Sequence, residues 1–301
     1  MLPTLKCQLM SDYSELPVAR LSKKEEGIER DLLREMDFGE IIDDFASKKA
    51  QKSPNIPVRY KCPTNKTPRR NRAFRHQKVP YIVNVQKNEH NECGGIIITS
   101  EIILTAAQCF HDENAFYSVL TASMHVGGRT RRNITHKIIY PHFNGDTLTG
   151  DLALLIIQPP IDLVHSPNRR IEIYNGILPT KSYVTLSGWG HLYGSGSRLV
   201  VSRHLRSIIV PTISVEECRS FYHDVRLITN QEICTFDRGG EKYGSNGDAG
   251  GPLVFGGKLV GVYSWGGDGH PRENPDVFMN LLYPLYRNWI LANVRLHHGW
   301  F

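Results

Sequence analysis

The 301-residue sequence lacks an apolar run of the length that a membrane helix needs. Its longest such run, residues 152–157, is far shorter than the roughly 20 apolar residues that cross a bilayer. The start of the chain also lacks the basic residues and the apolar stretch of a secretory signal peptide. We therefore expect no membrane span, and either a leader that has been removed or a chain that is not exported by the usual route.

Other absences exclude further classes of function. The 13 histidines and 6 cysteines show no zinc-type spacing, and there is no phosphate-binding loop. Residues 59–78 hold eight basic side chains and no acidic one, but no nucleic-acid-reading motif accompanies them. We expect no metal, no cofactor and no nucleic-acid partner.

Residues 1–78 read as an N-terminal extension. Ser22 followed by Glu25 is a capping-box signal, and apolar residues recur at helical spacing over 22–51: Ile28, Leu32, Met36 and Phe45. This stripe predicts a helix that docks on its own domain or on a partner. Residues 52–78 are Pro-rich and basic, which is typical of an extended linker. The basic part, 59–78, is either a solvated linker, a polyanion contact or, around Arg70, a cleavage site.

From residue 79 to 301 the pattern changes to short β-branched and aromatic runs separated by Gly, Pro and Asn. Many short strands without alternating helices favour an antiparallel barrel or sandwich. The last run, LYPLYRNWILANVR, predicts a closing amphipathic helix.

Six short motifs follow one another along this region. They are CGG at 93–95, LTAAQC at 104–109, GDLALL at 150–155, GWG at 188–190, GDAGGPL at 247–253 and SWG at 264–266. Their order and spacing resemble the trypsin-like (chymotrypsin-fold, peptidase family S1) serine proteases over about 220 residues. The resemblance implies an all-β fold: two packed six-stranded antiparallel β-barrels with a cleft between them and a C-terminal helix.

In that family a serine acts as nucleophile because a histidine takes its proton and a buried aspartate orients the histidine. By matched motif, the histidine position holds Gln108 and the serine position holds Ala249, so only Asp151 matches. An amide does not accept a proton near neutral pH, and alanine has no reactive heteroatom. We expect Asp151 to serve as a hydrogen-bonding carboxylate.

The activation apparatus departs from the family as well. The usual cleaved start would fall near Pro68, where nothing of that type stands, so Asp248 lacks its usual partner. A buried unpaired carboxylate is costly. We predict either another cation on Asp248 or a loosely ordered loop, and a doubtful oxyanion hole at Gly247 and Ala249.

The positions that resemble the specificity pocket are also altered. The resemblance places Tyr243 at the base of the pocket and Asp276 on a wall, beside Ser264, Trp265 and Gly266. A tyrosine at the base would fill the space that normally receives a basic side chain. Either Tyr243 packs a collapsed pocket, or the pocket is a remodelled peptide-binding slot.

The resemblance implies the disulfides Cys93–Cys109 and Cys218–Cys234. A third family bridge is missing at both ends, where Ser245 and approximately His270 stand. Cys7 and Cys62 pair with each other, join another chain or stay free. Disulfides and the sequons at Asn65 and Asn133 favour a secreted glycoprotein.

Three functions follow as hypotheses. We expect a secreted, catalytically inactive serine protease homologue, not an enzyme, that binds a protease, inhibitor or peptide segment as a cofactor or regulator. The alternative is an active endopeptidase in which residues such as His111 and Ser245 substitute. A further alternative is a polyanion-binding or surface-binding module that uses residues 59–78. The oligomeric state and the cleavage of residues 1–78 stay open.

Overall fold

The computed structural model describes residues 79–121, 130–193, 199–201, 204–223, 225–266 and 274–298. Several expectations lie outside these residues: the helix over 22–51, the linker and basic segment over 52–78, the start near Pro68, and the roles of Cys7, Cys62, Asn65, Arg70 and His270.

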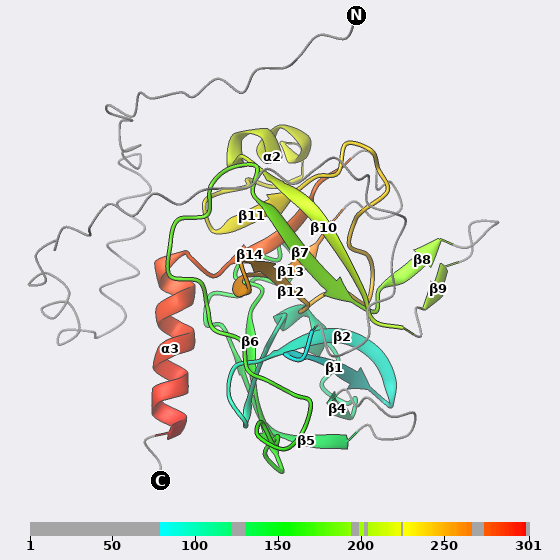
Figure 1. Ribbon diagram of the computed structural model, residues 1–301, viewed down its shortest axis with the longest axis vertical. Coiled ribbons are helices and arrows are strands. Elements are labelled where there is room, and N and C mark those ends of the chain that lie inside the picture. Colours follow the sequence, from blue (N-terminus) through cyan, green and yellow to red (C-terminus); the bar gives the residue numbers. More distant parts are fainter. Residues whose placement is uncertain are drawn as a thin grey trace, which may run out of the picture. The chain divides into compact units, whose positions relative to one another are not determined.

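Six strands in the first half of the described chain close into an antiparallel barrel (Figure 1). They are β1 (Ile82–Lys87), β2 (His90–Ile97), β3 (Ile102–Thr105), β4 (Tyr117–Thr121), β5 (Thr130–Ile139) and β6 (Ala153–Gln158), in the order β1-β2-β3-β6-β5-β4. The apolar side chains of β1, β3 and β6 are buried, whereas β5 has no fully buried residue. A short 3-10 helix, η2 (Ala107–Phe110), follows β3.

A second closed barrel follows in the order β10-β11-β14-β13-β12-β7. Its strands are β7 (Tyr183–Gly188), β10 (Arg206–Ile213), β11 (Glu232–Thr235), β12 (Pro252–Phe255), β13 (Lys258–Trp265) and β14 (Asp276–Asn280). Helix α2 (Val215–Tyr222) connects β10 to β11, and Ser214 caps it by accepting from the Glu217 N–H. Strands β8 (His191–Tyr193) and β9 (Leu199–Val201) pair separately.

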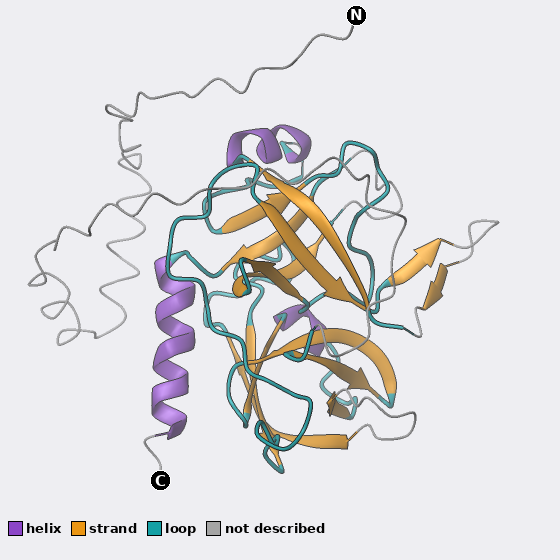
Figure 2. Cartoon of the chain, in the orientation of Figure 1, coloured by secondary structure: helices purple, strands orange, loops and turns teal. Residues whose placement is uncertain are grey.

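The C-terminal helix α3 (Pro284–His298) packs against residues of both barrels (Figure 2). Tyr286 and Trp289 contact the Tyr140 ring of the first barrel edge-to-face, with centroids 5.1 and 5.3 Å apart. The same buried cluster includes Val262 and Met279 of the second barrel. The predicted fold, two six-stranded antiparallel barrels and a closing helix, is confirmed. No described helix combines the length and apolarity needed to span a membrane.

Candidate active site at the barrel junction

Segments from both barrels meet where the barrels pack together. Gln108 lies in η2 and Asp151 just before β6, both in the first barrel. Ala249 precedes β12, and Ser264 lies near the end of β13, both in the second. Ala249 packs against the buried clusters of both barrels. We call Gln108, Asp151, Gly247, Ala249 and Ser264 the junction site.

Asp151 is the buried centre of the junction site. Its Oδ1 accepts from the Gln108 N–H at 2.8 Å, and its Oδ2 accepts from Gln108 Nε2 at 2.6 Å and Ser264 Oγ at 2.5 Å. Burial raises the pKa of the Asp151 carboxyl, while the hydrogen bonds from Ser264 and Gln108 oppose that rise. The carboxylate is thus fully engaged by neighbouring donors.

The orientation of the Gln108 amide follows from its acceptors. Nε2 donates to Asp151 and, at 2.7 Å, to the carbonyl of Ser264. Because an amide NH₂ has two hydrogens and both neighbours accept, the carbonyl oxygen Oε1 faces away from them. Gln108 therefore offers a fixed hydrogen-bond acceptor where the family has an imidazole.

The turn that carries Ala249 depends on two glycines with positive φ, Gly247 at +94° and Gly250 at +78°. The Gly250 N–H donates to the carbonyl of Tyr263 at 2.8 Å, and the carbonyl of Ala249 accepts from the Gly94 N–H at 2.7 Å. Within the described chain, the N–H groups of Gly247 and Ala249 have no acceptor. These N–H groups are the two expected oxyanion-hole donors.

The Asp248 side chain lies between the GWG motif and the start of its own turn. Its Oδ1 accepts from the Gly190 N–H at 2.7 Å and its Oδ2 from the Ser245 N–H at 3.0 Å. A Cβ at Gly188 or Gly190 would lie 1.9 or 2.1 Å from the carboxylate oxygens. The two glycines of the GWG motif therefore make room for the Asp248 side chain.

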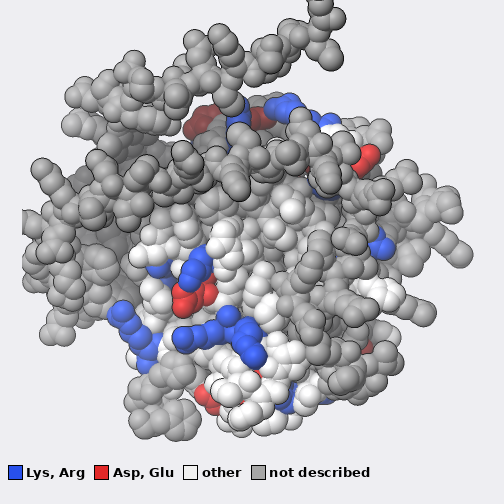
Figure 3. All heavy atoms as spheres, in the orientation of Figure 1, with Lys and Arg blue, Asp and Glu red and all other residues white. Residues whose placement is uncertain are grey.

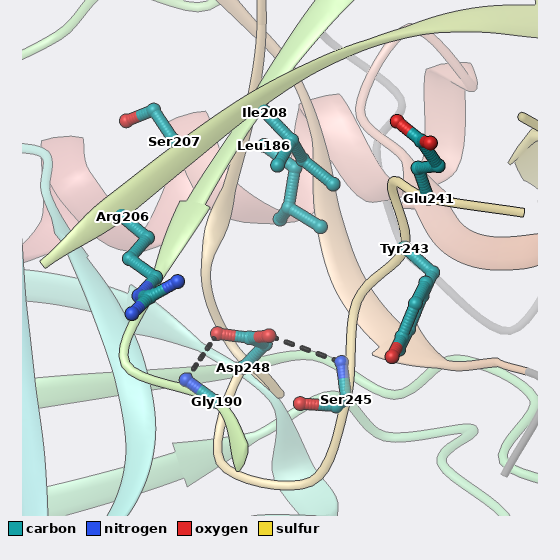
Figure 4. A pocket seen from close by; sticks show the side chains of 10 residues that line it. Leu186, Gly190, Arg206, Ser207, Ile208, Glu241, Tyr243, Ser245 and Asp248 are labelled. Carbon is teal, nitrogen blue, oxygen red and sulfur yellow. Dashed lines mark hydrogen bonds between the residues drawn. The ribbon is translucent and has the colours of Figure 1, made fainter. Parts of the chain in front are cut away.

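A cavity of about 80 Å³ lies beside Asp248 (Figure 4). Arg206 of β10 lines it and points toward the side where Asp248 lies, and Tyr243 and Glu241 line the opposite side. Sequence reasoning missed Arg206, since nothing in the β10 sequence ties it to a carboxylate 42 residues away. That another cation pairs with Asp248 stays a prediction.

The expected pocket residues separate into two groups. Asp276 is buried, and it accepts from the Gly244 N–H at 2.7 Å and from the Tyr263 hydroxyl at 3.4 Å. Gly266 lies against it, because a Cβ there would be 2.3 Å from Asp276 Oδ1. Tyr243 instead lines the cavity that holds Asp248. That Tyr243 fills the specificity pocket therefore stays a prediction.

Both disulfides implied by the motifs are confirmed. Cys93 of β2 bonds to Cys109 of η2, and Cys218 of α2 bonds to Cys234 of β11. The first bridge fixes the residue next to Gln108. No group of three or more His, Cys, Asp or Glu side chains is arranged to hold a metal within the described ranges.

Comparisons with known proteins match the same part of the chain. The family model described as Trypsin matches residues 69–290. Trypsin eta of Drosophila melanogaster is 34% identical over 203 residues, which cover 66% of this chain and 75% of that protein. Vitellin-degrading protease of Bombyx mori is 30% identical over 73% of this chain and 84% of its own length. Trypsin of Sus scrofa is 30% identical, with 72% and 90% covered.

These matches contradict the expectation that the chain is not an enzyme, because the relatives are named trypsins and proteases. The expectation was inferred from Gln108 and Ala249, with the departures at the activation site and in the specificity pocket in agreement. Loss of the usual base and nucleophile does not exclude catalysis by other groups. The match over residues 69–290, together with the two closed barrels, shows that the chain belongs to the trypsin family of chymotrypsin-fold serine proteases.

Proposed function

We propose that the junction site recognises the main chain of a polypeptide segment from another protein, such as a protease, an inhibitor or a peptide. The support is its set of hydrogen-bonding groups. The N–H groups of Gly247 and Ala249 are donors without an acceptor among described residues, and Gln108 Oε1 is an acceptor. A peptide bond presents one carbonyl acceptor and one N–H donor, so it complements this set.

The test uses the full chain and a small disulfide-bonded protein inhibitor of trypsins, which presents a rigid extended loop. We expect the chain to bind this inhibitor protein in titration calorimetry. Gln108→Leu keeps the side-chain size and the backbone N–H bond to Asp151, but it removes the acceptor and the side-chain bonds to Asp151 and to the Ser264 carbonyl. Since one hydrogen bond contributes about 1 kcal/mol, the variant is expected to bind at least about fivefold more weakly.

His111→Gln is the matched control, because His111 is an exposed neighbour three residues along the chain. Its affinity is expected to equal that of the wild type. Absence of binding, or equal losses in both variants, would contradict recognition at the junction site.

Peptide-bond hydrolysis is a second candidate function, favoured by the names of the relatives. It requires a nucleophile other than residue 249. The Ser264 hydroxyl already donates to a buried carboxylate, with its Oγ 2.5 Å from Asp151 Oδ2. Burial raises the pKa of Asp151, which brings the carboxyl nearer to the range of a general base.

Hydrolysis is tested in the same samples with a panel of fluorogenic peptides and a fluorophosphonate probe. If Ser264 is the nucleophile, the probe labels it, and Ser264→Ala abolishes both labelling and turnover. Turnover that survives Ser264→Ala excludes this residue, and peptide mapping of the labelled protein then identifies the group that reacted.

We further propose that the protein is secreted and glycosylated. Its two disulfides fit an oxidising compartment. Asn133 is exposed on β5, and Thr135 of its sequon is exposed as well. Expression in insect cells is expected to yield a secreted form whose mass falls on treatment with a glycosidase. If the Asn133→Gln variant is secreted at the wild-type level and its glycan mass is unchanged, the glycan is attached at another residue.

Polyanion binding through residues 59–78 remains a separate prediction outside the described residues. On the face seen in Figure 3, the visible described basic and acidic side chains are interspersed, without an extended region of one sign. Support would come from heparin binding by the full chain that weakens steeply as the salt concentration rises. Deletion of residues 59–78 should then abolish this binding.

A further inference from the structure

The turn between α2 and β11 contains a buried charge beside the junction site. The side chain of Arg226 is only 9% exposed, although its neighbours Val225 and Leu227 are 73% and 66% exposed. An arginine that is held inward between two outward apolar residues must be fixed by specific contacts.

One set of contacts holds Arg226 within the second barrel. Its Nη2 lies 2.5 Å from Oε1 of Glu232, which is 2% exposed. The other oxygen of Glu232 accepts from the N–H of Thr229 at 2.9 Å and from its hydroxyl at 3.0 Å. The carboxylate is therefore saturated on both sides, and the guanidinium has a rigid partner.

A second set of contacts reaches the first barrel. Arg226 Nη1 donates to the carbonyl of Thr147, in the segment between β5 and β6. That segment leads directly into Asp151. The guanidinium also lies over the ring of Trp265, 5.0 Å from its centroid, and Trp265 directly follows Ser264. Arg226 thus contacts both segments that carry partners of Gln108.

Stability alone does not explain this arrangement. Removing two charges from water is costly, and apolar side chains of similar size are often at least as stabilising as a buried ion pair. An apolar pair, however, would not bind the Thr147 carbonyl. What the arginine adds is a directed link between two barrels, made by a planar group with donors on both sides.

We propose that Arg226 is a positioning residue that clasps residues 143–149 of the first barrel to Trp265 and Glu232 of the second. The clasp sets the spacing of the two sides of the junction site. Its effect on ligand binding rests on the proposed function, whereas its effect on the segment does not.

The test compares wild type with Arg226→Met/Glu232→Gln, which removes both charges and leaves neither one unpaired. Hydrogen exchange is read at the amides of Asn144, Asp146 and Thr147, which are bonded within the segment. We expect exchange there to be at least tenfold faster, and the inhibitor protein to bind at least tenfold more weakly. Arg226→Lys keeps the charge but not the two-sided geometry. Its exchange rate and its affinity for the inhibitor protein are expected to lie between those of the wild type and the double variant.

The exposed pair Lys258–Glu172 supplies the matched control, and Lys258→Met/Glu172→Gln is expected to change neither quantity. If the Arg226→Met/Glu232→Gln variant folds and the exchange of its amides at 144, 146 and 147 is unchanged, Arg226 does not hold residues 143–149 in place. Faster exchange with unchanged affinity for the inhibitor protein overturns its role in positioning the site. If that variant does not fold, the same two readouts on Arg226→Lys decide. If the wild type binds no inhibitor protein, the proposed function fails, and the exchange result still decides whether the clasp exists.

Discussion

At the scale of single residues, the junction site retains a buried carboxylate whose usual imidazole neighbour is an amide. Among the described residues, Gln108 donates to Asp151 through both its backbone and its side chain, and Ser264 donates through its hydroxyl. The amide can donate in the direction where an imidazole N–H would, but it cannot take up a proton. The hydrogen-bond geometry around Asp151 therefore persists without the proton-transfer chemistry of the usual pair.

The charge of Asp151 predicts a pH dependence of stability. Because burial raises its folded-state pKa above the unfolded value, the folded chain holds this proton more tightly than the unfolded chain. The contribution of Asp151 to stability then falls as the pH rises from about 4 through the folded pKa. We expect the wild type to lose stability relative to Asp151→Asn between pH 4 and pH 7. Urea unfolding of both proteins measures this, and a constant difference would mean that the pKa is not raised.

The close approach of Gly190 to Asp248 predicts a steric cost. Gly190→Ala would place a Cβ 2.1 Å from Asp248 Oδ2 and 2.6 Å from Ser245 Oγ. Overpacking of this kind costs about 1–3 kcal/mol. Gly145→Ala is the control, because no atom lies within 4 Å of its Cβ position, and it is expected to change stability by less than about 0.5 kcal/mol. Equal urea midpoints for the two variants would mean that Asp248 leaves room for a Cβ at residue 190.

At the scale of elements, the two disulfides form a natural matched pair. Each closes a loop with a sequence separation of 16 residues. The loop-entropy model gives about 3 kcal/mol for a loop of this size. We therefore expect Cys93→Ala/Cys109→Ala and Cys218→Ala/Cys234→Ala to lose about the same free energy of unfolding.

The two disulfide variants are expected to differ at the junction site. Only loss of Cys93–Cys109 frees η2, so only that variant should show faster exchange of the Gln108 amide, which donates to Asp151. Faster exchange of this amide in the other variant alone would contradict the assignment of the first bridge to the site.

Most elements could be predicted from the sequence where burial imposes a pattern. The run VPYIVNVQ covers all of β1 except Lys87, and LYPLYRNWILANVR lies almost wholly within α3. The first half of β5 was not predicted, because its exposed, charged residues carry no apolar alternation and pairing with β4 and β6 holds it in place. Helix α2 was also missed, although Ser214 and Glu217 have the spacing of a helix start.

The site was predictable only where motifs mark it. The motifs implied that Gln108 and Asp151 belong together, and the structure places them in direct contact. Arg226 could not be found in this way, because its contact with Thr147 joins residues 79 positions apart and depends on how the barrels pack. Long-range contacts of this kind leave no periodic signal along the chain.

At the scale of the whole molecule, both barrels and the helix α3 meet in one buried cluster, and the junction site takes its residues from both barrels. Asp151, the matching position of the family's triad, is in place and accepts from Gln108 and Ser264. Gln108→His/Ala249→Ser is therefore expected to hydrolyse fluorogenic peptides at least about a hundredfold faster than the wild type, because a general base alone contributes ~10²–10⁴-fold. An unchanged rate would mean that the turn at Gly247 does not support the chemistry.

The most direct test of peptide-bond recognition is an NMR titration of the isotope-labelled full chain with the inhibitor protein. We expect the amides of Gly247 and Ala249 and the side-chain amide of Gln108 to shift together, with one dissociation constant. If the inhibitor protein binds while these three groups stay unchanged, the junction site is not where this protein recognises polypeptides.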